Sequence, residues 1–145
     1  MGLKHRLSVA YRATRYCVEL PGASLVLRVQ RRAPTLRMWL AWQGLRRWAL
    51  LTAWNPRSKY PPRLLPRGRN QARQQALQAV LKRQGYRSYA ARNIPLAAAA
   101  RKRWTEESLF VPGLSLYKAR RLARHFGQVG FLAGCRSGLA RLVFC

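Results

Sequence analysis

The pattern of apolar and polar residues predicts β-hairpins near both ends of the chain. Residues 15–20 and 24–29 are rich in β-branched, aromatic and aliphatic residues, and a Pro-Gly turn signal separates them. Residues 129–133 and 139–144 have the same character and flank a turn with a glycine at each end. We therefore expect two antiparallel hairpins, one early in the chain and one that closes it.

Three segments place their apolar residues at helical spacing, and each is followed by a glycine that can stop a helix. The expected helices span residues 34–43, 70–84 and 115–126. The expected core-facing residues are Leu36, Trp39 and Leu40 in the first helix, Ala72, Ala76, Leu77, Val80 and Leu81 in the second, and Leu116, Ala119, Leu122, Ala123 and Phe126 in the third. Such one-sided stripes predict helices that cover a sheet.

The remaining strands are expected in the middle of the chain. Residues 48–54 form a continuous apolar run, which is typical of a central strand buried on both faces. Residues 86–94 alternate between apolar and polar, and residues 107–111 form a short β-rich run that ends at a Pro-Gly pair. Residues 95–103 are alanine-rich and basic, and we expect an irregular connection there.

The predicted order of elements is ββαβαββαββ. A chain of 145 residues suits one domain, and no repeat or linker divides it. We expect a single α+β domain over residues 14–145, with a mixed β-sheet flanked by about three helices. Residues 1–13 precede it as a basic N-terminal arm, either loosely ordered or folded as a short helix.

The charge of the chain has the largest effect on the functional interpretation. The 29 Lys and Arg residues face only three acidic residues, so the formal net charge is +26. Those acidic residues are Glu19, Glu106 and Glu107, which excludes a carboxylate-rich metal site. A folded domain with this charge repels itself, and a polyanion is its natural counter-charge. With 24 Arg and 5 Lys, the composition favours phosphate, which guanidinium groups bind through two hydrogen bonds.

The sequence leaves three interpretations of this charge open. The first is nucleic-acid binding, and the second is binding to an anionic membrane surface or an acidic protein. The third is a charge that is incidental or was imposed on an existing scaffold, since GC-rich coding raises Arg, Ala and Leu together. No run of 18 apolar residues occurs, so no transmembrane helix is expected.

The best candidate site is the stretch from Asn55 to Arg73. It combines a Pro-rich loop, a dense run of bases and the expected helix start at Asn70, where free backbone N–H groups can hold a phosphate. The simpler interpretations are that Asn70 is only an N-cap, that Asn55 lies in a turn, and that the bases form a solvated loop. The predicted nucleic-acid-binding residues here are Arg57, Lys59, Arg63, Arg67 and Arg69.

Two other basic clusters extend this prediction. One lies beside Trp104, so that charge and a stacking ring occur together as in single-stranded nucleic-acid sites, although Trp104 also suits a core position. The other follows one face of the third expected helix, where an ordinary solvated face is an equal alternative. The residues are Arg101, Lys102 and Arg103 in the first cluster and Arg120, Arg121 and Arg124 in the second. The aromatic pattern of an RNA-recognition module is absent.

The sequence contains no recognisable catalytic constellation. Glu106 and Glu107 are adjacent, so on a strand they face opposite sides and cannot act as a carboxylate pair. We expect one of them to pair with a buried arginine such as Arg73. The chain also lacks a P-loop, a nucleophile elbow and a zinc-protease motif. We therefore expect a binding protein rather than an enzyme, with no cofactor and no metal.

The three cysteines are Cys17, Cys135 and Cys145, an odd number without metal-ligand spacing. We expect reduced thiols without a disulfide, in a reducing compartment. The cytoplasm is the expected location. The mitochondrial matrix is the alternative, because the N-terminus is rich in Arg and lacks acidic residues.

Four short segments carry a resemblance to a known family. They are residues 51–56, 70–77, 106–111 and 122–128, and the most specific part is Thr-Ala-Trp-Asn-Pro followed by Asn-Gln-Ala-Arg. Through these segments, residues 10–144 resemble a bacterial domain-of-unknown-function family, number 3293. The resemblance implies a compact α/β domain, with no established activity. It also implies polar groups at Asn55, Asn70, Arg73, Glu107 and Gln128.

The chain departs from this family in its charge. Members resemble ordinary, mildly acidic proteins, whereas all three expected helices here have bases in their first turns, including Arg37, Arg73 and Lys118. Ser115 can cap the third helix, but Lys118 stands where the glutamate of a capping box belongs. Positive charge at a helix start opposes the helix dipole, at a cost of roughly a few tenths of a kcal/mol.

These observations predict sequence-nonspecific binding to the RNA backbone, as a structural component of a ribonucleoprotein such as a ribosome. The expected partner is RNA or another polyanion. The alternative from a different class is a small-molecule or enzymatic domain, with a concave pocket around Asn55, Asn70, Arg73 and Glu107. A binder of anionic membrane surfaces or acidic proteins is a further alternative.

Overall fold

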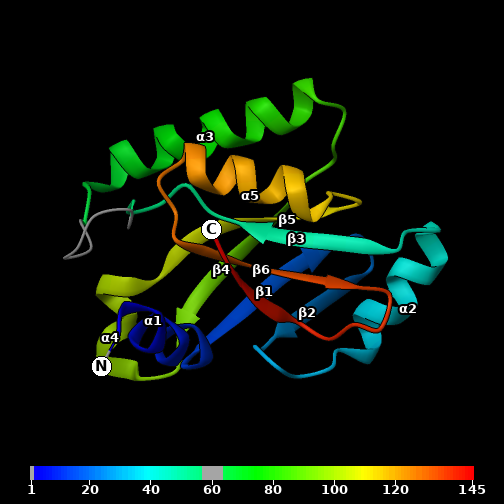
Figure 1. The fold of residues 1–145 in the computed structure, drawn as a ribbon, viewed down its shortest axis with the longest axis horizontal. Coiled ribbons are helices and arrows are strands. Elements are labelled where there is room, and N and C mark those ends of the chain that lie inside the picture. The colour runs from blue at the N-terminus through cyan, green and yellow to red at the C-terminus, as the bar shows by residue number, and fades with distance from the viewer. Residues whose placement is uncertain (1, 57–63) are drawn as a thin grey trace.

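The computed structural model describes residues 2–56 and 64–145 of the chain. Figure 1 shows the helices and strands within these residues. The helices are α1 (Leu3–Arg12), α2 (Pro34–Gln43), α3 (Arg67–Arg83), α4 (Ala98–Trp104) and α5 (Leu116–His125). The strands are β1 (Thr14–Leu20), β2 (Ala23–Leu27), β3 (Arg47–Leu51), β4 (Tyr89–Pro95), β5 (Glu106–Pro112), β6 (Gly130–Cys135) and β7 (Arg141–Phe144).

The strands form one sheet in the order β2-β1-β4-β5-β3-β6-β7, and each neighbouring pair is antiparallel. The predicted single α+β domain is confirmed, but the sheet is antiparallel rather than mixed, and more than three helices flank it. The helical crossovers explain the difference. Helix α3 joins β3 to β4 and α5 joins β5 to β6, and each joined pair runs in one direction. One antiparallel strand lies between the two strands of each pair, so no parallel neighbours arise.

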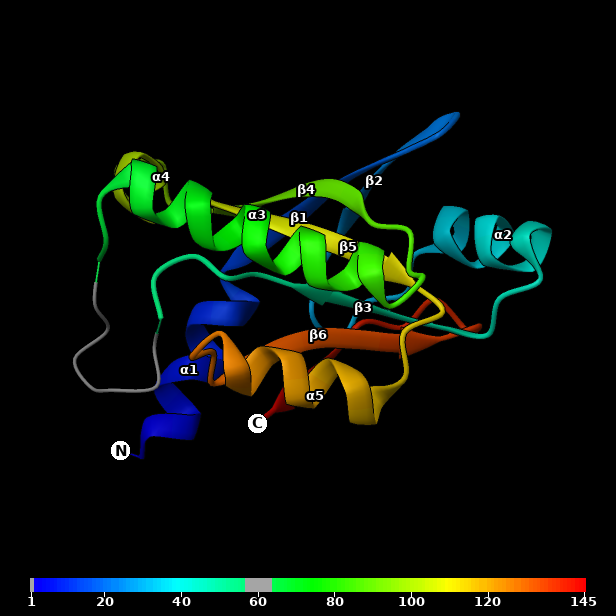
Figure 2. The same ribbon diagram turned by 90° about the horizontal axis from the view of Figure 1, so that it is seen from above.

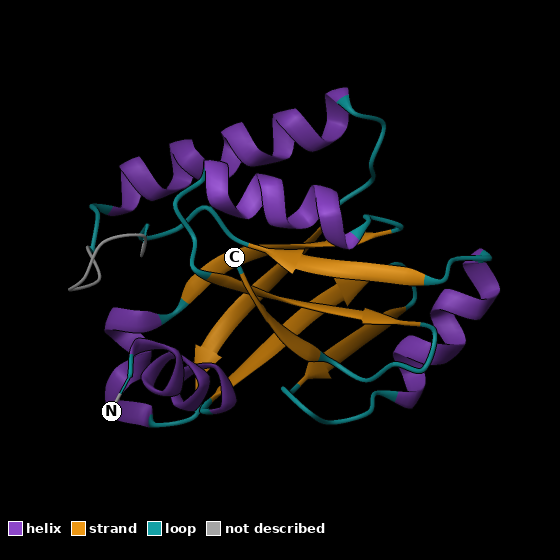
Figure 3. Ribbon diagram, viewed as in Figure 1, coloured by secondary structure: helices purple, strands orange, loops and turns teal. Residues whose placement is uncertain are grey.

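Helices cover both faces of the sheet. Figures 1 and 2 show α3 and α5 over one face, and Figure 3 shows α1 and α4 at one end of the sheet and α2 at the other. Along β3, Trp48 and Leu50 face the core shared with α1 and α2, whereas Ala49 and Leu51 face the core under α3 and α5. Because both faces of β3 are buried, its sequence is a continuous run of apolar residues.

Local signals located most of the elements correctly. The two predicted hairpins are β1–β2 and β6–β7. The glycines at the predicted helix ends, Gly44, Gly85 and Gly127, all have positive φ, which glycine adopts without strain. Strand β3 ends at Leu51 rather than at residue 54, so the last part of the apolar run lies outside the sheet.

Helix α3 begins three residues earlier than predicted. Pro66 precedes the helix and Arg67 is its first residue. Asn70 therefore lies inside the first turn and is 2% exposed, so the predicted N-cap is wrong. Pro66 is the N-cap residue, and its carbonyl accepts the first helical hydrogen bond, from the Asn70 N–H at 3.1 Å.

The buried stripes of α3 and α5 also differ from the expected ones. In α3 the buried residues are Asn70, Gln74, Leu77 and Leu81, whereas Ala72 and Ala76 are exposed. In α5, Leu116 is 47% exposed, while Ala119, Leu122, Ala123 and Phe126 are buried as predicted. Two of the four buried positions of α3 are polar, and hydrophobic periodicity alone assigns such a helix the wrong rotation.

Two helices form where strand and helix signals are weak. Residues 3–12, expected as a loosely ordered arm or a short helix, form α1, which joins the core through the buried ring of Tyr11. The Tyr11 hydroxyl donates a hydrogen bond to the carbonyl of Gly130 at 2.9 Å. Helix α4 stands in place of the expected irregular connection, and its alanines are the strongest helix formers.

The three cysteines are free thiols. A hydrogen bond with Ser137 lowers the pKa of the exposed Cys135, whereas burial raises the pKa of Cys145. Over residues 2–56 and 64–145, no three His, Cys, Asp or Glu side chains come together in a group that could hold a metal ion.

Candidate nucleic-acid interface

Residues 52–55 leave the sheet after β3, and side chains from other elements bind their backbone. The Ala53 N–H donates to Gln74 Oε1 at 2.9 Å, and the Trp54 carbonyl accepts from Gln128 Nε2 at 2.9 Å. Buried backbone groups without partners are costly, so these side chains replace the strand pairing that ends at residue 51.

Asn55 and Asn70 bind each other at the end of this segment. The Asn55 N–H donates to Asn70 Oδ1 at 2.9 Å, and Asn70 Nδ2 donates to Asn55 Oδ1 at 2.8 Å. Asn55 Oδ1 also accepts from the Leu65 N–H at 2.9 Å, and Asn55 Nδ2 donates to Glu106 Oε1 at 3.2 Å. Asn55 has a φ of 44° and is 3% exposed; asparagine tolerates this conformation better than most residues. The two side chains therefore hold both sides of the loop together.

Arg73, also on α3, holds the same segment. Its Nε donates to the Ala53 carbonyl at 2.7 Å, and its Nη2 donates to the Phe126 carbonyl. These carbonyl partners take the place of the glutamate that we expected. Burial, followed by the positive charge of Arg69, lowers the pKa of Arg73. The planar guanidinium suits this task because it directs several N–H groups at fixed angles.

We call Asn55, Asn70, Arg73, Gln74 and Gln128 the clamp. The clamp fixes residues 52–55 by hydrogen bonds from α3 and from the loop after α5. Four of its members are family-like polar positions, and Gln74 was missed because its polarity argues against a core position. The fifth such position, Glu107, is half-buried, and its backbone carbonyl accepts from Thr52 Oγ1 at 2.6 Å.

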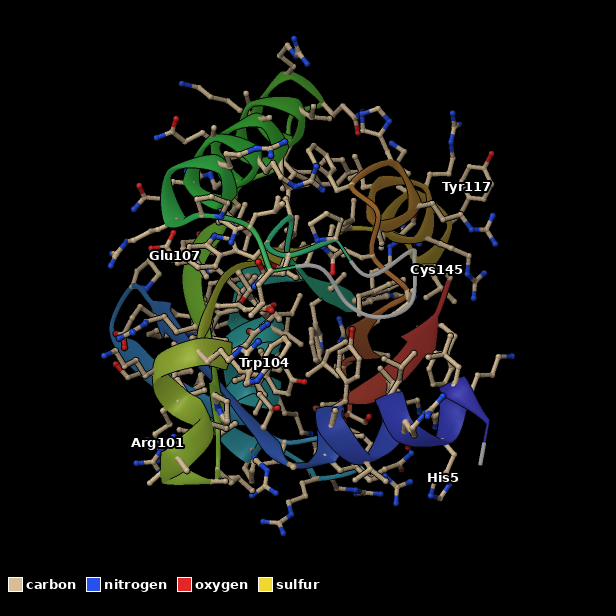
Figure 4. All side chains as sticks on the ribbon, turned by 90° about the vertical axis from the view of Figure 1, so that its left-hand side faces the viewer. His5, Arg101, Trp104, Glu107, Tyr117 and Cys145 are labelled. Carbon is tan, nitrogen blue, oxygen red and sulfur yellow. The ribbon has the colours of Figure 1, made fainter. Side chains whose placement is uncertain are left out.

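A cleft of about 900 Å³ lies beside the clamp, between α3 and α4. Asn55, Asn70, Glu106 and Glu107 contribute to its walls. Five exposed cations also line it, and we call them the cation rim: Arg67, Arg92, Arg101, Lys102 and Arg103. Figure 4 views the molecule from this side, with Arg101 on α4 and Glu107 toward α3. The cleft thus has a largely cationic border next to a buried polar wall.

Two arginines of the rim contact neighbouring groups of the protein. Arg101 donates to the carbonyls of Pro95 and Leu96, at 3.1 and 3.0 Å, which ties α4 to the end of β4. The Arg103 guanidinium lies 5.7 Å from the centre of the Trp104 ring. Trp104 itself is half-buried and lines an apolar cavity, so its ring is part of the interior rather than an exposed stacking platform.

The structure brings together only part of the predicted nucleic-acid-binding set. Arg67, Arg101, Lys102 and Arg103 line the cleft. Arg69 is exposed on α3 but is not part of the lining. Arg57, Lys59 and Arg63 lie outside the described residues, and Arg120, Arg121 and Arg124 lie apart from the cleft on α5. The predicted phosphate site at Asn70 is wrong, because the helix starts at Arg67 and Asn70 is buried.

Arg92 is the rim residue that our sequence interpretation missed. It lies on β4 directly opposite Glu107 of β5. Ala91 is buried and Arg92 is exposed, as expected for neighbours on a strand. The alternation of apolar and polar residues over 86–94 indicated that Arg92 is exposed, because it places Arg92 on the face opposite to Ala91.

Comparisons with known proteins supply a family and no further relative. None of the helices in the described ranges has the length and apolar character needed to span a bilayer. No curated protein and no solved structure matches the chain. A family model described as "Protein of unknown function (DUF3293)" matches residues 51–130, from the end of β3 to the start of β6. This match covers more than half of the chain and includes the clamp and the cation rim, so the chain belongs to the DUF3293 family.

Proposed function

We propose that the protein binds the RNA backbone without sequence preference, through the cation rim. The observation that carries the proposal is the gathering of five exposed cations from α3, β4 and α4 around one cleft. Guanidinium and ammonium groups at such a border suit phosphate oxygens, which carry no sequence information.

The scarcity of exposed acidic residues supports a polyanion as the partner, and the two carboxylates that line the cleft are largely covered. Glu106 is 3% exposed and Glu107 is half-buried. Glu19 is exposed, and it accepts a hydrogen bond from Ser24 at 2.6 Å. With a formal net charge of +26, the surface has almost no negative charge of its own. A phosphate chain in the cleft reduces this self-repulsion and gains attraction from the whole field of the protein.

The small-molecule alternative has less support at the residues proposed for it. Asn55, Asn70 and Glu107 line the cleft, but Arg73 does not. The amide groups of Asn55 and Asn70 already bind each other, Leu65 and Glu106. Polar atoms that hold a loop in this way are poorly placed to recognise a ligand. The rim cations are better suited, because their charged ends reach solvent.

The test is the salt dependence of affinity for a short single-stranded RNA, measured by fluorescence anisotropy. With the single-strand coefficient of about −0.7 per phosphate, neutralising about 6–10 phosphates gives a slope of log affinity against log salt between about −4 and −7. A scrambled sequence of the same length is expected to bind with similar affinity. A slope near zero contradicts the polyanion interpretation, and preferential binding to anionic vesicles supports the membrane alternative.

A pair of matched variants tests the rim itself. The rim variant carries Arg67→Gln, Arg92→Gln, Lys102→Gln and Arg103→Gln, and it keeps Arg101 because that residue holds α4 in place. The control variant carries Arg31→Gln, Arg46→Gln, Arg87→Gln and Arg136→Gln, which are exposed and lie outside the cleft lining. Both lose four charges. We expect the rim variant to reduce the slope by about 3 and the control to change it by less than about 1. An equal reduction of the slope in both variants contradicts a role of the rim in RNA binding.

A further inference from the structure

A second cavity, distinct from the cation rim, lies on the other side of the sheet. It has a volume of about 350 Å³ and lies among α1, α4 and the inner face of the sheet. Its walls are mainly apolar and come from elements far apart in the sequence. They include Leu7, Tyr11, Leu50, Trp104, Phe131 and Leu132.

The size of this cavity sets it apart from a packing defect. Protein cores are close-packed, and the voids within them rarely exceed a water molecule. A cavity of about 350 Å³ is in the range of pockets that bind small molecules. The residues around it are otherwise packed: Leu50 is 3% exposed and Phe131 is also 3% exposed. The cavity, which is partly open to solvent, is therefore a local feature of an otherwise packed region.

Polar groups gather at one part of this wall. Asn93 on β4 lies directly opposite Glu106 on β5, and Thr52 follows β3, the next strand in the sheet. Ser108 Oγ donates to Asn93 Oδ1 at 2.7 Å, so the Asn93 side chain is held in place. Glu106 Oε1 accepts from Asn55 Nδ2 at 3.2 Å at the same part of the wall. The side-chain oxygen atoms of Asn93, Thr52 and Glu106 therefore place hydrogen-bond acceptors together at one part of the cavity.

We propose that this cavity binds a neutral, compact and mainly apolar molecule that carries one hydrogen-bond donor. The apolar walls select an aromatic or aliphatic body, and the donor meets the oxygen atoms near Glu106 and Thr52. None of the described lining residues is Lys or Arg, so an anionic head finds no cation in this cavity, and a cationic ligand is disfavoured by the net charge of the protein. The walls do not include the four cations changed in the rim variant, and Glu106 is the residue that this cavity shares with the cleft beside the rim.

Three probes with one ring system test this chemistry on the wild-type protein. They are 2-naphthol, which has a donor; 2-methoxynaphthalene, which lacks it; and 2-naphthoate, which is anionic. Titration calorimetry is expected to give naphthol at least a fivefold higher affinity than the ether, with naphthoate the weakest. Equal affinity of all three compounds, or tighter binding of naphthoate, overturns the proposed ligand chemistry.

Two variants of α4 test the location. Ala100 lines the cavity, so Ala100→Trp fills part of it, whereas Ala99 is exposed on the same helix and is not part of the lining. We expect Ala100→Trp to lower naphthol affinity at least tenfold and Ala99→Trp to leave it within twofold. Thermal melts establish that both variants are folded. If Ala100→Trp does not fold, a second measurement locates the site. Naphthol is added to the wild-type protein, and the methyl NMR shifts of Leu7, Leu50 and Leu132 are expected to change. Unchanged shifts, or equal affinity of the two variants, overturn the assignment.

Discussion

The clamp and the cation rim meet at the same cleft, where Asn55 and Asn70 represent the clamp in the wall, but their polar side chains are arranged in opposite ways. Asn55, Asn70, Gln74 and Gln128 of the clamp are between 2% and 7% exposed, and they hydrogen-bond to backbone groups of residues 53–55 or to each other. The rim residues are exposed, and among them Arg101 donates hydrogen bonds to two backbone carbonyls of the protein. Polar residues of the clamp therefore stabilise the fold, whereas polar residues of the rim are accessible to a binding partner.

This difference has an energetic consequence. Removing one partner of a buried hydrogen bond leaves the other unsatisfied, which costs stability. Removing an exposed cation from a chain of charge +26 relieves repulsion and costs the fold little. Clamp variants are therefore expected to lose stability, and rim variants to lose RNA binding.

The largest effect is expected for Asn55→Ala. The change removes the side-chain partners of Leu65, Asn70 and Glu106 and places alanine at a φ of 44°. We expect a loss of about 3 kcal/mol in the free energy of unfolding, measured with urea. Asn55→Gly is the control, because glycine accepts this φ and isolates the loss of the hydrogen bonds. If both variants unfold with the same free energy as the wild type, the stabilising role of the clamp is contradicted.

A smaller effect is expected for Arg73→Lys. Lysine keeps the positive charge but cannot reach both the Ala53 and Phe126 carbonyls with one planar group. We expect a loss of about 1–2 kcal/mol in the free energy of unfolding. Arg69→Lys is the matched control on the same helix, because Arg69 is exposed. The salt slope for RNA is expected to stay unchanged in both; a reduced slope in Arg73→Lys alone shows that the clamp binds RNA directly.

A bound polyanion is expected to distinguish clamp variants from rim variants by its effect on the melting temperature. Heparin or RNA binds the folded form, so it stabilises by RT ln(1 + [L]/Kd), which is about 2.7 kcal/mol at a hundredfold excess over Kd. We expect the melting temperature to rise in the wild type and in Asn55→Gly, and to rise much less in the rim variant. A neutral osmolyte at the same concentration is the control. An equal rise in the rim variant contradicts binding at the rim.

The sequence correctly predicted the elements that are determined by residues close together in the chain. The hairpins, the helix-ending glycines and the Ser115 cap each rest on residues within a few positions of each other. The strand order does not, because β4 pairs with both β1 and β5 through long-range contacts. Hydrophobic periodicity therefore predicted the number of strands but not their antiparallel arrangement.

The candidate site shows the same limit at the level of single residues. Asn70 was expected to cap a helix, but its partner Asn55 is 15 residues away, and Trp54 and Gln128 are 74 residues apart. A pattern of neighbouring residues contains no information on such pairs. The basic residues of α4 were predicted because their charge is a local property, whereas their grouping with Arg67 and Arg92 depends on the fold.

The smallest expected effect is at the start of α5, far from both regions. Ser115 Oγ accepts from the Lys118 N–H at 3.2 Å, and the first turn contains no acidic residue. Lys118→Glu completes a capping box and reverses the unfavourable charge at this helix end. It also removes a hydrogen bond of 3.0 Å from Lys118 Nζ to the Tyr86 hydroxyl and a contact with the Tyr86 ring.

Because the Tyr86 contacts are exposed, the capping gain is expected to exceed their loss. We expect Lys118→Glu to stabilise the RNA-free protein by about 0.5 kcal/mol in urea unfolding. Lys118→Ala is the control that removes the Tyr86 contacts without completing the box, and it is expected to be neutral or slightly destabilising. Since α5 contributes nothing to the rim, the RNA salt slope of Lys118→Glu should change by no more than that of the control variant with four distant arginines replaced. A larger change in slope places α5 on the RNA-binding surface together with the rim.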